Sequence, residues 1–359
     1  MKAYVLKGIN QFAPEEVEVP AVAENEVLVA VKAAGICGSD IPRVYYTGTY
    51  SYPLIPGHEF SGVVESVGSG VEKSWQGKRV GIFPLIPCRK CGPCRKKQYE
   101  MCRNYSYLGS RRDGGFAEYV SVPADNLIEL PEQVSFEEAA MLEPMAVAVH
   151  AMRRVQPKAS DTVAVCGLGT IGLLLVMFLK EAGVENILVI GNKEFQRSAV
   201  LRLGLPMENY CNCKETDVTQ WINSRTDGTG VDIFFECVGK NETVVQAVNS
   251  TIPGGKIMLV GNPHSDMQLE KPVYWKILRH QLWVTGTWNS SFSFPGDEGT
   301  EPDDWQYVLK KLEEKRIAPA DFITHRFSMD ELEKGFHIMR DKAEDYVKVM
   351  GEHHAGVIY

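Results

Sequence analysis

A glycine-rich turn between an apolar strand and an apolar helix most strictly limits what this chain can fold into. The strand-like run TVAVC leads directly into GLGTIG, and a helical pattern follows. In such a turn the first glycine permits a tight bend, the second lets backbone approach a pyrophosphate, and the third lets the helix pack on the strand. The helix N-terminus offers N–H groups to phosphate. The alternative is a glycine-rich turn that binds nothing. The pattern favours a dinucleotide site at Gly167, Gly169, Thr170, Ile171 and Gly172.

Four further apolar segments follow this turn and mostly alternate with helical patterns. They cover residues 186–190, 231–236, 256–260 and 282–285. Apolar strands separated by helices indicate a parallel sheet that is covered on both faces. The first 130 residues instead contain short valine-rich runs between glycines and prolines, which is typical of β-rich, barrel-like structure. They cover residues 26–31, 62–67 and 114–120. A chain of 359 residues is therefore expected to form two domains.

A run of helix-forming residues at 137–155 joins these two parts of the sequence. Pro144 is expected to end or kink a first helix there, because proline has no N–H and clashes with the preceding turn. Beyond about residue 286 the sequence returns to loops and helices, and it ends in a strand-like segment at 347–350.

The end of the second strand after the turn bears on the type of dinucleotide. A carboxylate that binds the adenosine ribose is expected about 20 residues after the glycines. Gly191, Asn192 and Lys193 stand there instead, and Glu194 comes later. Gly191 leaves room for a 2′-phosphate that Asn192, Lys193 and Arg197 could bind. The sequence thus favours NADP(H), with NAD(H) as the alternative.

Four of the nine cysteines form a metal-binding pattern. They are spaced C-x2-C-x2-C-x7-C within a lobe at 88–102 that is rich in glycine, proline, lysine and arginine. Four thiolates on one zinc ion could fold such a lobe, and a closed site of this kind is structural. The alternative is four free thiols in a loop. The expected ligands are Cys88, Cys91, Cys94 and Cys102.

A second possible zinc site is spread along the sequence. Cys37, His58 and Glu143 supply one thiolate, one imidazole and one carboxylate, and Glu59 follows His58 directly. Three such ligands with water in the fourth position make an open, catalytic site. Each residue alone would more often be structural, so the prediction depends on their combination. Two zinc ions per chain are therefore expected.

Charge and hydropathy limit the partners. The chain has a net charge of −8, 44% hydrophobic residues and 23% charged residues. No apolar run reaches the ~18 residues that a membrane span needs. Nucleic-acid binding normally requires a clustered basic face. The segment MKAYVLKG lacks the apolar core of a signal peptide, so a cytoplasmic location is expected. The expected partner is a small molecule, with no nucleic acid and no membrane.

Six motifs stand in a familiar order along the whole chain: GICGSD, PGHEFSG, CRKCGPC, GGFAEY, LEP and GLGTIG. In this order they resemble the zinc-containing medium-chain dehydrogenase/reductase family. The resemblance implies an α/β plus β-rich fold, in which a Rossmann dinucleotide-binding domain is inserted in a GroES-like catalytic domain. The catalytic domain would span 1–145 and 286–359, and the Rossmann domain 146–285.

Within that family the chain is similar to the sorbitol dehydrogenase branch and to bacterial galactitol-phosphate dehydrogenases, through ICGSDIPR, YPLIPGHEFSG and GSRRDGGFAEY. This resemblance implies hydride transfer between a nicotinamide cofactor and a secondary alcohol of a polyol, by a homodimer or homotetramer. It also implies that Glu59 is an exchangeable or nearby fourth carboxylate of the catalytic zinc. Ser39 would take the substrate proton. Many relatives have a histidine where Pro42 stands, so the onward path of the proton stays open.

Arginines near the expected catalytic site bear on the substrate. Arg43 follows Cys37 by six residues, and Arg112 precedes GGFAEY directly after Arg111. Guanidinium groups bind phosphate bidentately, which favours a hexitol phosphate such as galactitol 1-phosphate and its keto-sugar phosphate. The alternatives are that Arg43 is an exposed helix residue and Arg112 part of a solvated turn, with a free polyol such as sorbitol as the substrate. A non-catalytic member of the same fold is a further alternative.

Overall fold

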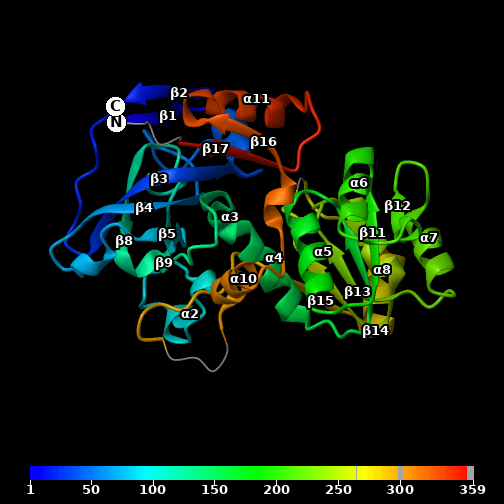
Figure 1. Cartoon of the computed structure of the whole chain (residues 1–359). Coiled ribbons are helices and arrows are strands. Elements are labelled where there is room, and N and C mark those ends of the chain that lie inside the picture. The colour runs from blue at the N-terminus through cyan, green and yellow to red at the C-terminus, as the bar shows by residue number, and fades with distance from the viewer. Residues whose placement is uncertain (264, 298–301, 354–359) are drawn as a thin grey trace. The chain divides into compact units, whose positions relative to one another are not determined.

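The computed structural model describes residues 1–263, 265–297 and 302–353. The chain forms two compact units: Met1–Glu143 with Ser291–Tyr359, and Pro144–Ser290. In Figure 1 the first unit holds the blue, cyan, orange and red elements, and the second the green and yellow ones. No helix among the described residues is long and apolar enough to cross a membrane.

The second unit is built on a six-stranded parallel sheet in the order β12-β11-β10-β13-β14-β15. Numbered from its own first strand, this order is 3-2-1-4-5-6, the Rossmann arrangement. The parallel sheet expected from the sequence is confirmed. The strands are β10 (Thr162–Cys166), β11 (Asn186–Gly191), β12 (Tyr210–Asn212), β13 (Val231–Glu236), β14 (Thr251–Leu259) and β15 (Trp283–Gly286). Only β12 was not expected, because three residues carry too little pattern.

Helices separate these strands in sequence. They are α4 (Leu142–Val155), α5 (Thr170–Glu181), α6 (Glu194–Arg202), α7 (Val218–Arg225), α8 (Asn241–Ser250) and α9 (Lys271–Arg279), with the 3-10 turn η5 (Met207–Asn209). The central strands are buried through most of their length; Val163, Val165, Phe234 and Phe235 are fully buried. Successive strand residues point to opposite faces, so their burial requires cover on both faces of the sheet.

The expected break at Pro144 was wrong. Helix α3 (Phe136–Ala140) begins with a capping box between Ser135 and Glu138, and the chain breaks at Met141. Helix α4 starts one residue later, which makes Pro144 its third residue. Proline is tolerated in a first turn because the N–H groups there have no partner within the helix.

The first unit contains a seven-stranded sheet in the order β16-β17-β3-β4-β5-β9, with β8 paired to β3. Two two-stranded sheets accompany it, β1-β2 and β6-β7. The strands are β1 (Lys2–Gly8), β2 (Gln11–Glu16), β3 (Glu26–Ile36), β4 (Glu59–Val67), β5 (Arg79–Ile82), β6 (Leu85–Ile86), β7 (Ser106–Tyr107), β8 (Tyr119–Pro123), β9 (Leu127–Glu129), β16 (Ile323–Ser328) and β17 (Lys348–Glu352). Figure 1 shows β17, in red, beside β3, in blue. Strand β17 thus lies against the strand that leads to Cys37.

Short helices complete this unit. They are α1 (Asp40–Pro42), α2 (Gly92–Arg95), α3, α10 (Asp304–Glu313) and α11 (Leu332–Asp341), with the π-helical turn η1 (Arg43–Thr47). The 3-10 turns are η2 (Lys73–Trp75), η3 (Tyr99–Met101), η4 (Ala124–Asn126), η6 (Pro319–Phe322) and η7 (Met329–Glu331). The apolar core joins strand residues such as Val29 and Phe60 to Phe116 and to Phe336 of α11.

The expected strand at 114–120 is mostly a loop, and β8 begins only at Tyr119. The N–H of Gly115 donates to the Gly57 carbonyl at 2.8 Å. A Cβ on Gly114 would collide with the Gly57 backbone, and one on Gly115 with the Phe60 ring. The two glycines therefore serve close packing against the segment before His58.

Candidate functional site

The pairing of β3 with β4 brings the first group of predicted zinc ligands together. Cys37 follows the last residue of β3, and His58 precedes Glu59, the first residue of β4. The two strands are antiparallel and pair Gly35 with Glu59, so the end of one meets the start of the other. The ligand atoms of Cys37, His58 and Glu59 all lie within 4.8 Å of one another. One ion could therefore contact all three side chains.

The charge pattern of this group fits a metal. His58 is buried, and its Nδ1 has no hydrogen-bond partner among the described residues; the nearest carboxylate oxygen, on Asp40, is 3.5 Å away. Burial opposes protonation of His58, but the charges of Asp40 and Cys37 prevail and raise its pKa to about 10. Burial also opposes ionisation of Cys37, yet His58 holds the pKa of this thiol below its ordinary value. A thiolate beside a buried imidazole whose Nδ1 has no hydrogen bond to the described residues is a donor set suited to zinc.

Asp40 is a residue of this site that the sequence analysis missed. It is fully buried, it accepts the Cys37 N–H at 3.0 Å, and it forms an ion pair with Arg43. Burial would raise its pKa, but His58 and Arg43 keep the pKa low. Asp40 therefore fixes the Cys37 turn and stabilises positive charge on His58. Its position three residues after Cys37 was the signal that could have identified it.

Lys348 is the second missed residue. It is buried, its Nζ forms an ion pair with Glu59, and it donates to the Ile36 carbonyl at 3.1 Å. Lys348 opens β17, which pairs with β3 next to Ile36. Because it lies 289 residues from Glu59 in sequence, no local pattern pointed to it.

Glu143 lies close to this site but is held by a different partner. It is the second residue of α4, and its Oε1 accepts the Tyr107 hydroxyl at 3.1 Å. The Tyr107 ring packs edge-on against His58, with centroids 5.8 Å apart. Burial raises the pKa of Glu143, and burial together with Glu143 raises that of Tyr107. Glu143 is not within common ligand distance of the other three, so its role as a zinc ligand stays a prediction.

Ser39 lies beside the predicted ligands. Its Oγ donates to the Cys37 sulfur at 3.3 Å, and the side chain is partly exposed. Pro42, where a histidine relay was considered, is the last residue of α1 and carries no group that transfers protons. The role of Ser39 as proton acceptor also stays a prediction.

The four cysteines of the 88–102 lobe converge as their spacing suggested. Their sulfurs all lie within 4.8 Å of one another. The Cys91–Cys94 pair is 3.4 Å apart, and Cys88–Cys94 and Cys91–Cys102 are each 3.9 Å apart. Ligand sulfurs on tetrahedral zinc are about 3.8 Å apart, given Zn–S bonds near 2.3 Å. The arrangement thus fits one zinc ion.

The glycine-rich turn of the second unit shows three different environments. Gly167 has a φ of +98°, which favours glycine, and a Cβ on Gly172 would collide with the Gly167 carbonyl. At Gly169, the N-cap of α5, no described residue other than its chain neighbours has an atom within 4 Å of the Cβ position. The first glycine thus makes the bend, the third allows close packing, and the second leaves open space at a helix N-terminus. Thr170 and Ile171 begin that helix. This geometry fits a pyrophosphate.

The end of β11 holds the predicted 2′-phosphate residues. Gly191 ends the strand, and the Asn192 N–H donates to Gln196 at 2.9 Å. The Lys193 ammonium lies over the Phe195 ring at 5.3 Å. Arg197 forms a partly exposed ion pair with Glu194 at 3.3 Å. Two cations therefore lie in the first turn of α6 or just before it, although Glu194 partly neutralises the charge of Arg197.

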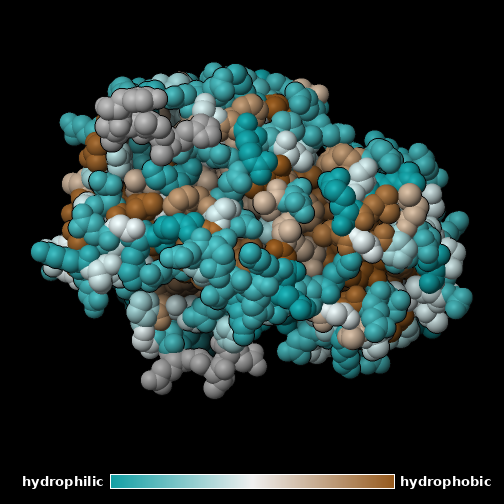
Figure 2. All heavy atoms as spheres, viewed as in Figure 1, coloured by the Kyte–Doolittle hydropathy of each residue, from teal (hydrophilic) through white to brown (hydrophobic). Residues whose placement is uncertain are grey.

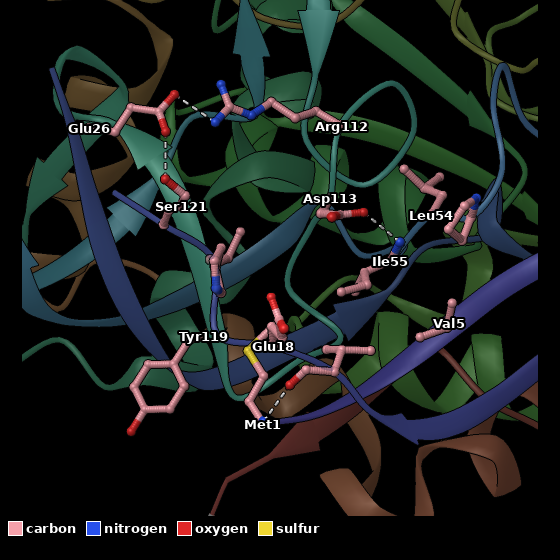
Figure 3. Close-up of a pocket in the computed structure, with 15 residues that line it drawn as sticks. Met1, Val5, Glu18, Glu26, Leu54, Ile55, Arg112, Asp113, Tyr119 and Ser121 are labelled. Atoms are coloured by element: carbon pink, nitrogen blue, oxygen red, sulfur yellow. Dashed lines mark hydrogen bonds and ion pairs between the residues drawn. The ribbon is translucent and has the colours of Figure 1, made fainter. Parts of the chain in front are cut away.

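Arg112 lines a cavity that is separate from the cluster of Cys37 and His58, as Figure 3 shows. Its guanidinium pairs with Glu26 at 2.6 Å, and Glu26 also accepts the Ser121 hydroxyl at 2.5 Å. The cavity has a volume of about 370 Å³, and neither Cys37 nor His58 lines it. The structure therefore does not bring Arg112 together with the predicted catalytic residues, whereas Arg43 lies beside them in its ion pair with Asp40.

Comparisons with known proteins agree with this architecture. The alcohol dehydrogenase GroES-like domain matches residues 23–132, and the zinc-binding dehydrogenase domain matches residues 170–314. The chain belongs to the zinc-dependent medium-chain alcohol dehydrogenase family. Its fold is a Rossmann domain combined with a GroES-like catalytic domain, as the sequence predicted.

Its relatives place it in the sorbitol dehydrogenase branch. It is 35% identical to galactitol 1-phosphate 5-dehydrogenase of Escherichia coli K12, over 86% of this chain and 87% of that protein. It is 32% identical to sorbitol dehydrogenase of Bacillus subtilis, over 82% and 84%. The crystal structure of galactitol-1-phosphate dehydrogenase from Escherichia coli superposes with a TM-score of 0.90 at 32% identity, over 98% and 100%.

A zinc-binding dehydrogenase from Sinorhizobium meliloti, solved with NADP bound, superposes with a TM-score of 0.88 at 29% identity, over 98% of each chain. The chain is thus a zinc-dependent oxidoreductase of alcohols that uses a nicotinamide dinucleotide. The predicted enzyme class and both kinds of cofactor are confirmed.

Proposed function

We propose that this enzyme oxidises a secondary alcohol of a hexitol phosphate, such as galactitol 1-phosphate, to the keto-sugar phosphate, with NADP as the hydride acceptor. The reverse reduction follows the same path. The observation that carries the proposal is the convergence of Cys37, His58 and Glu59 within 4.8 Å, next to Ser39. When bound, zinc supplies a Lewis acid that lowers the pKa of a substrate hydroxyl, and the nicotinamide supplies the hydride chemistry.

We assign the catalytic zinc to Cys37, His58 and Glu143, with Glu59 as an exchangeable carboxylate. Glu59 is held by the buried ammonium of Lys348, so ligation by Glu59 would have to break an ion pair. Among the described residues, Glu143 accepts a hydrogen bond only from the neutral Tyr107 hydroxyl, and this bond costs less to give up than an ion pair. Asp40 holds the Cys37 turn in place.

We assign to Ser39 the role of accepting the proton of the substrate hydroxyl. Its Oγ is 3.3 Å from the Cys37 sulfur, so it lies next to a ligand of the proposed metal. Pro42 has no donor or acceptor in its side chain, and we therefore assign the next transfer to water.

The similarity to galactitol 1-phosphate 5-dehydrogenase supports a phosphorylated polyol, and the similarity to sorbitol dehydrogenase supports a free polyol as the second candidate. The test is the 340 nm absorbance of NADP(H) with galactitol 1-phosphate, galactitol and sorbitol, before and after treatment with a chelator. We expect kcat/KM at least tenfold higher for the phosphate, and no activity after metal removal. Absence of turnover with every polyol would refute the proposed function.

We also propose that two copies associate through β15. It is the last strand of its sheet, and no further strand among the described residues pairs with its outer edge. Trp283 and Val284 on this strand are exposed, as are Tyr274 and Trp275 on the neighbouring α9. Figure 2 shows hydrophobic residues at the visible surface of this unit. Identical strand edges can pair about a two-fold axis, which favours a homodimer, with a homotetramer as the alternative.

A further inference from the structure

Three arginines, Arg43, Arg111 and Arg112, were candidates from the sequence or adjoin one, and they have different partners. Arg43 forms an ion pair with buried Asp40, and Arg112 pairs with Glu26. Arg111 is exposed, and among the described residues its guanidinium forms no ion pair or hydrogen bond. Of the three, only Arg111 therefore keeps both its charge and its N–H donors available for an anion.

Two tyrosine rings hold this guanidinium. The central carbon of the Arg111 guanidinium lies 3.9 Å from the ring centroid of Tyr50 and 4.7 Å from that of Tyr105. Both distances are within the range of cation–π contacts. A cation–π contact attracts the charge of the guanidinium to the ring faces and uses none of its N–H donors, so these donors remain able to bind an anion. A guanidinium that is already oriented loses less freedom when it binds a phosphate.

The loop that carries Arg111 starts at the metal site. Tyr107 packs against His58 at 5.8 Å and against Tyr105 at 6.1 Å. The backbone N–H of Arg111 donates to the Tyr107 carbonyl at 2.9 Å. The Thr49 hydroxyl donates to the Ser110 carbonyl at 2.7 Å, which ties the segment of Tyr50 to the same loop. Packed rings and hydrogen bonds thus connect His58 to Arg111 within one unit.

We infer that Arg111, held by Tyr50 and Tyr105, binds the phosphate of the substrate and is the residue that selects phosphorylated over free polyols. The inference rests on the proposed function, because it places the reacting alcohol at the cluster of Cys37 and His58. The guanidinium edge can bind two phosphate oxygens at once. On a chain with a net charge of −8, one local uncompensated cation also attracts a dianion to this loop.

The test compares Arg111→Gln with Arg340→Gln in the zinc-loaded, full-length enzyme. Arg340 is a matched control because its guanidinium also lies over a tyrosine ring, that of Tyr45 at 4.8 Å, outside the predicted site. We expect Arg111→Gln to lower kcat/KM for galactitol 1-phosphate by about ten- to a hundredfold, the effect of a lost charge-assisted contact. The value for free galactitol should stay within about twofold, and Arg340→Gln should change neither. Loss of phosphate preference in Arg112→Gln instead would overturn the inference.

A second measurement does not depend on turnover. Calorimetric titration with inorganic phosphate should show binding to wild type and to Arg340→Gln, at least tenfold weaker binding to Arg111→Gln, and partial recovery in Arg111→Lys. Equal phosphate binding by wild type and Arg111→Gln would overturn the inference. An enzyme that oxidises galactitol and its phosphate equally well would also overturn it but leave the proposed reaction standing. Inactivity with every polyol, with Arg111-dependent phosphate binding retained, would refute the reaction alone.

Discussion

Glu59 and Lys348 form a buried ion pair beside the proposed zinc ligands, and each side chain is only 2% exposed. An ion pair in the interior offsets the cost of removing two charges from water, and removing one partner leaves the other charge without compensation. At the scale of single residues, we therefore predict that this pair couples the stability of the first unit to the order of the proposed zinc site.

We predict that Lys348→Met lowers the free energy of unfolding by about 3–5 kcal/mol, because it leaves the Glu59 carboxylate buried and unpaired. Adding Glu59→Gln should restore much of this loss, since the double variant has no buried charge at either position. Lys2→Met is the control; Lys2 forms an exposed ion pair with Asp330 and should leave unfolding near that of wild type. Denaturant unfolding measures all four proteins. If Lys348→Met is as stable as wild type, the ion pair has no structural role.

At the scale of elements, the cysteine lobe is too small to fold by its own packing. Its helix α2 has four residues, and Cys94 and Cys102 are the only cysteines of the lobe that are buried. We therefore predict that a zinc ion bound by the four sulfurs keeps the lobe ordered.

We predict two zinc ions in wild type and one in Cys91→Ser, together with a lower melting temperature of the variant, because three thiolates cannot close a tetrahedral site. Cys213→Ser changes an exposed cysteine outside the lobe and should keep both ions. Elemental analysis of dialysed protein measures the zinc content. Two zinc ions in Cys91→Ser would show that the lobe is ordered in another way.

The residues at the end of β11 are predicted to determine the choice between NADP and NAD. We predict that Gly191→Asp lowers the preference for NADP over NAD by about tenfold or more, because a carboxylate repels the 2′-phosphate and accepts the ribose hydroxyls of NAD. A Cβ there would lie 2.8 Å from the flexible end of Gln196, so the new side chain also crowds the strand end. Gly191→Ala separates this crowding from charge and should keep the NADP preference. A wild-type enzyme that already favours NAD tenfold would contradict the assignment.

At the scale of the whole molecule, the exposed edge of β15 predicts association. Trp283→Lys places a charge on that edge and should shift the protein from dimer to monomer, because a buried charge opposes strand pairing between copies. Ile9→Lys changes an exposed apolar residue in the other unit and should leave the dimer intact. Light scattering after size-exclusion chromatography measures the mass. A monomeric wild type would refute the proposed interface.

Much of the fold and of the candidate site could be predicted from contiguous segments of the sequence. These segments contain the three glycines of the turn, the four cysteines of the lobe and the alternation of strands and helices. Each pattern lies within a short stretch, so local backbone geometry alone indicates the structure that it forms. The sequence at 167–172 therefore predicted the separate roles of its three glycines, and the cysteine spacing at 88–102 predicted the convergence of four sulfurs. The same local reasoning failed at Pro144 and at Gly114, where the position within a helix and the packing of a loop decided the outcome.

Only the tertiary structure decided which partner each charged side chain has. Strand pairing brings Lys348 to Glu59, and loop packing brings Tyr107 to Glu143. Of the three arginines compared, Arg43 and Arg112 form ion pairs, and Arg111 forms none with the described residues. Sequence shows that such groups exist but not how they pair, because an ion pair or hydrogen bond depends on a few ångströms. Those distances are set by the register of strands and the packing of the core, to which residues hundreds of positions apart contribute together.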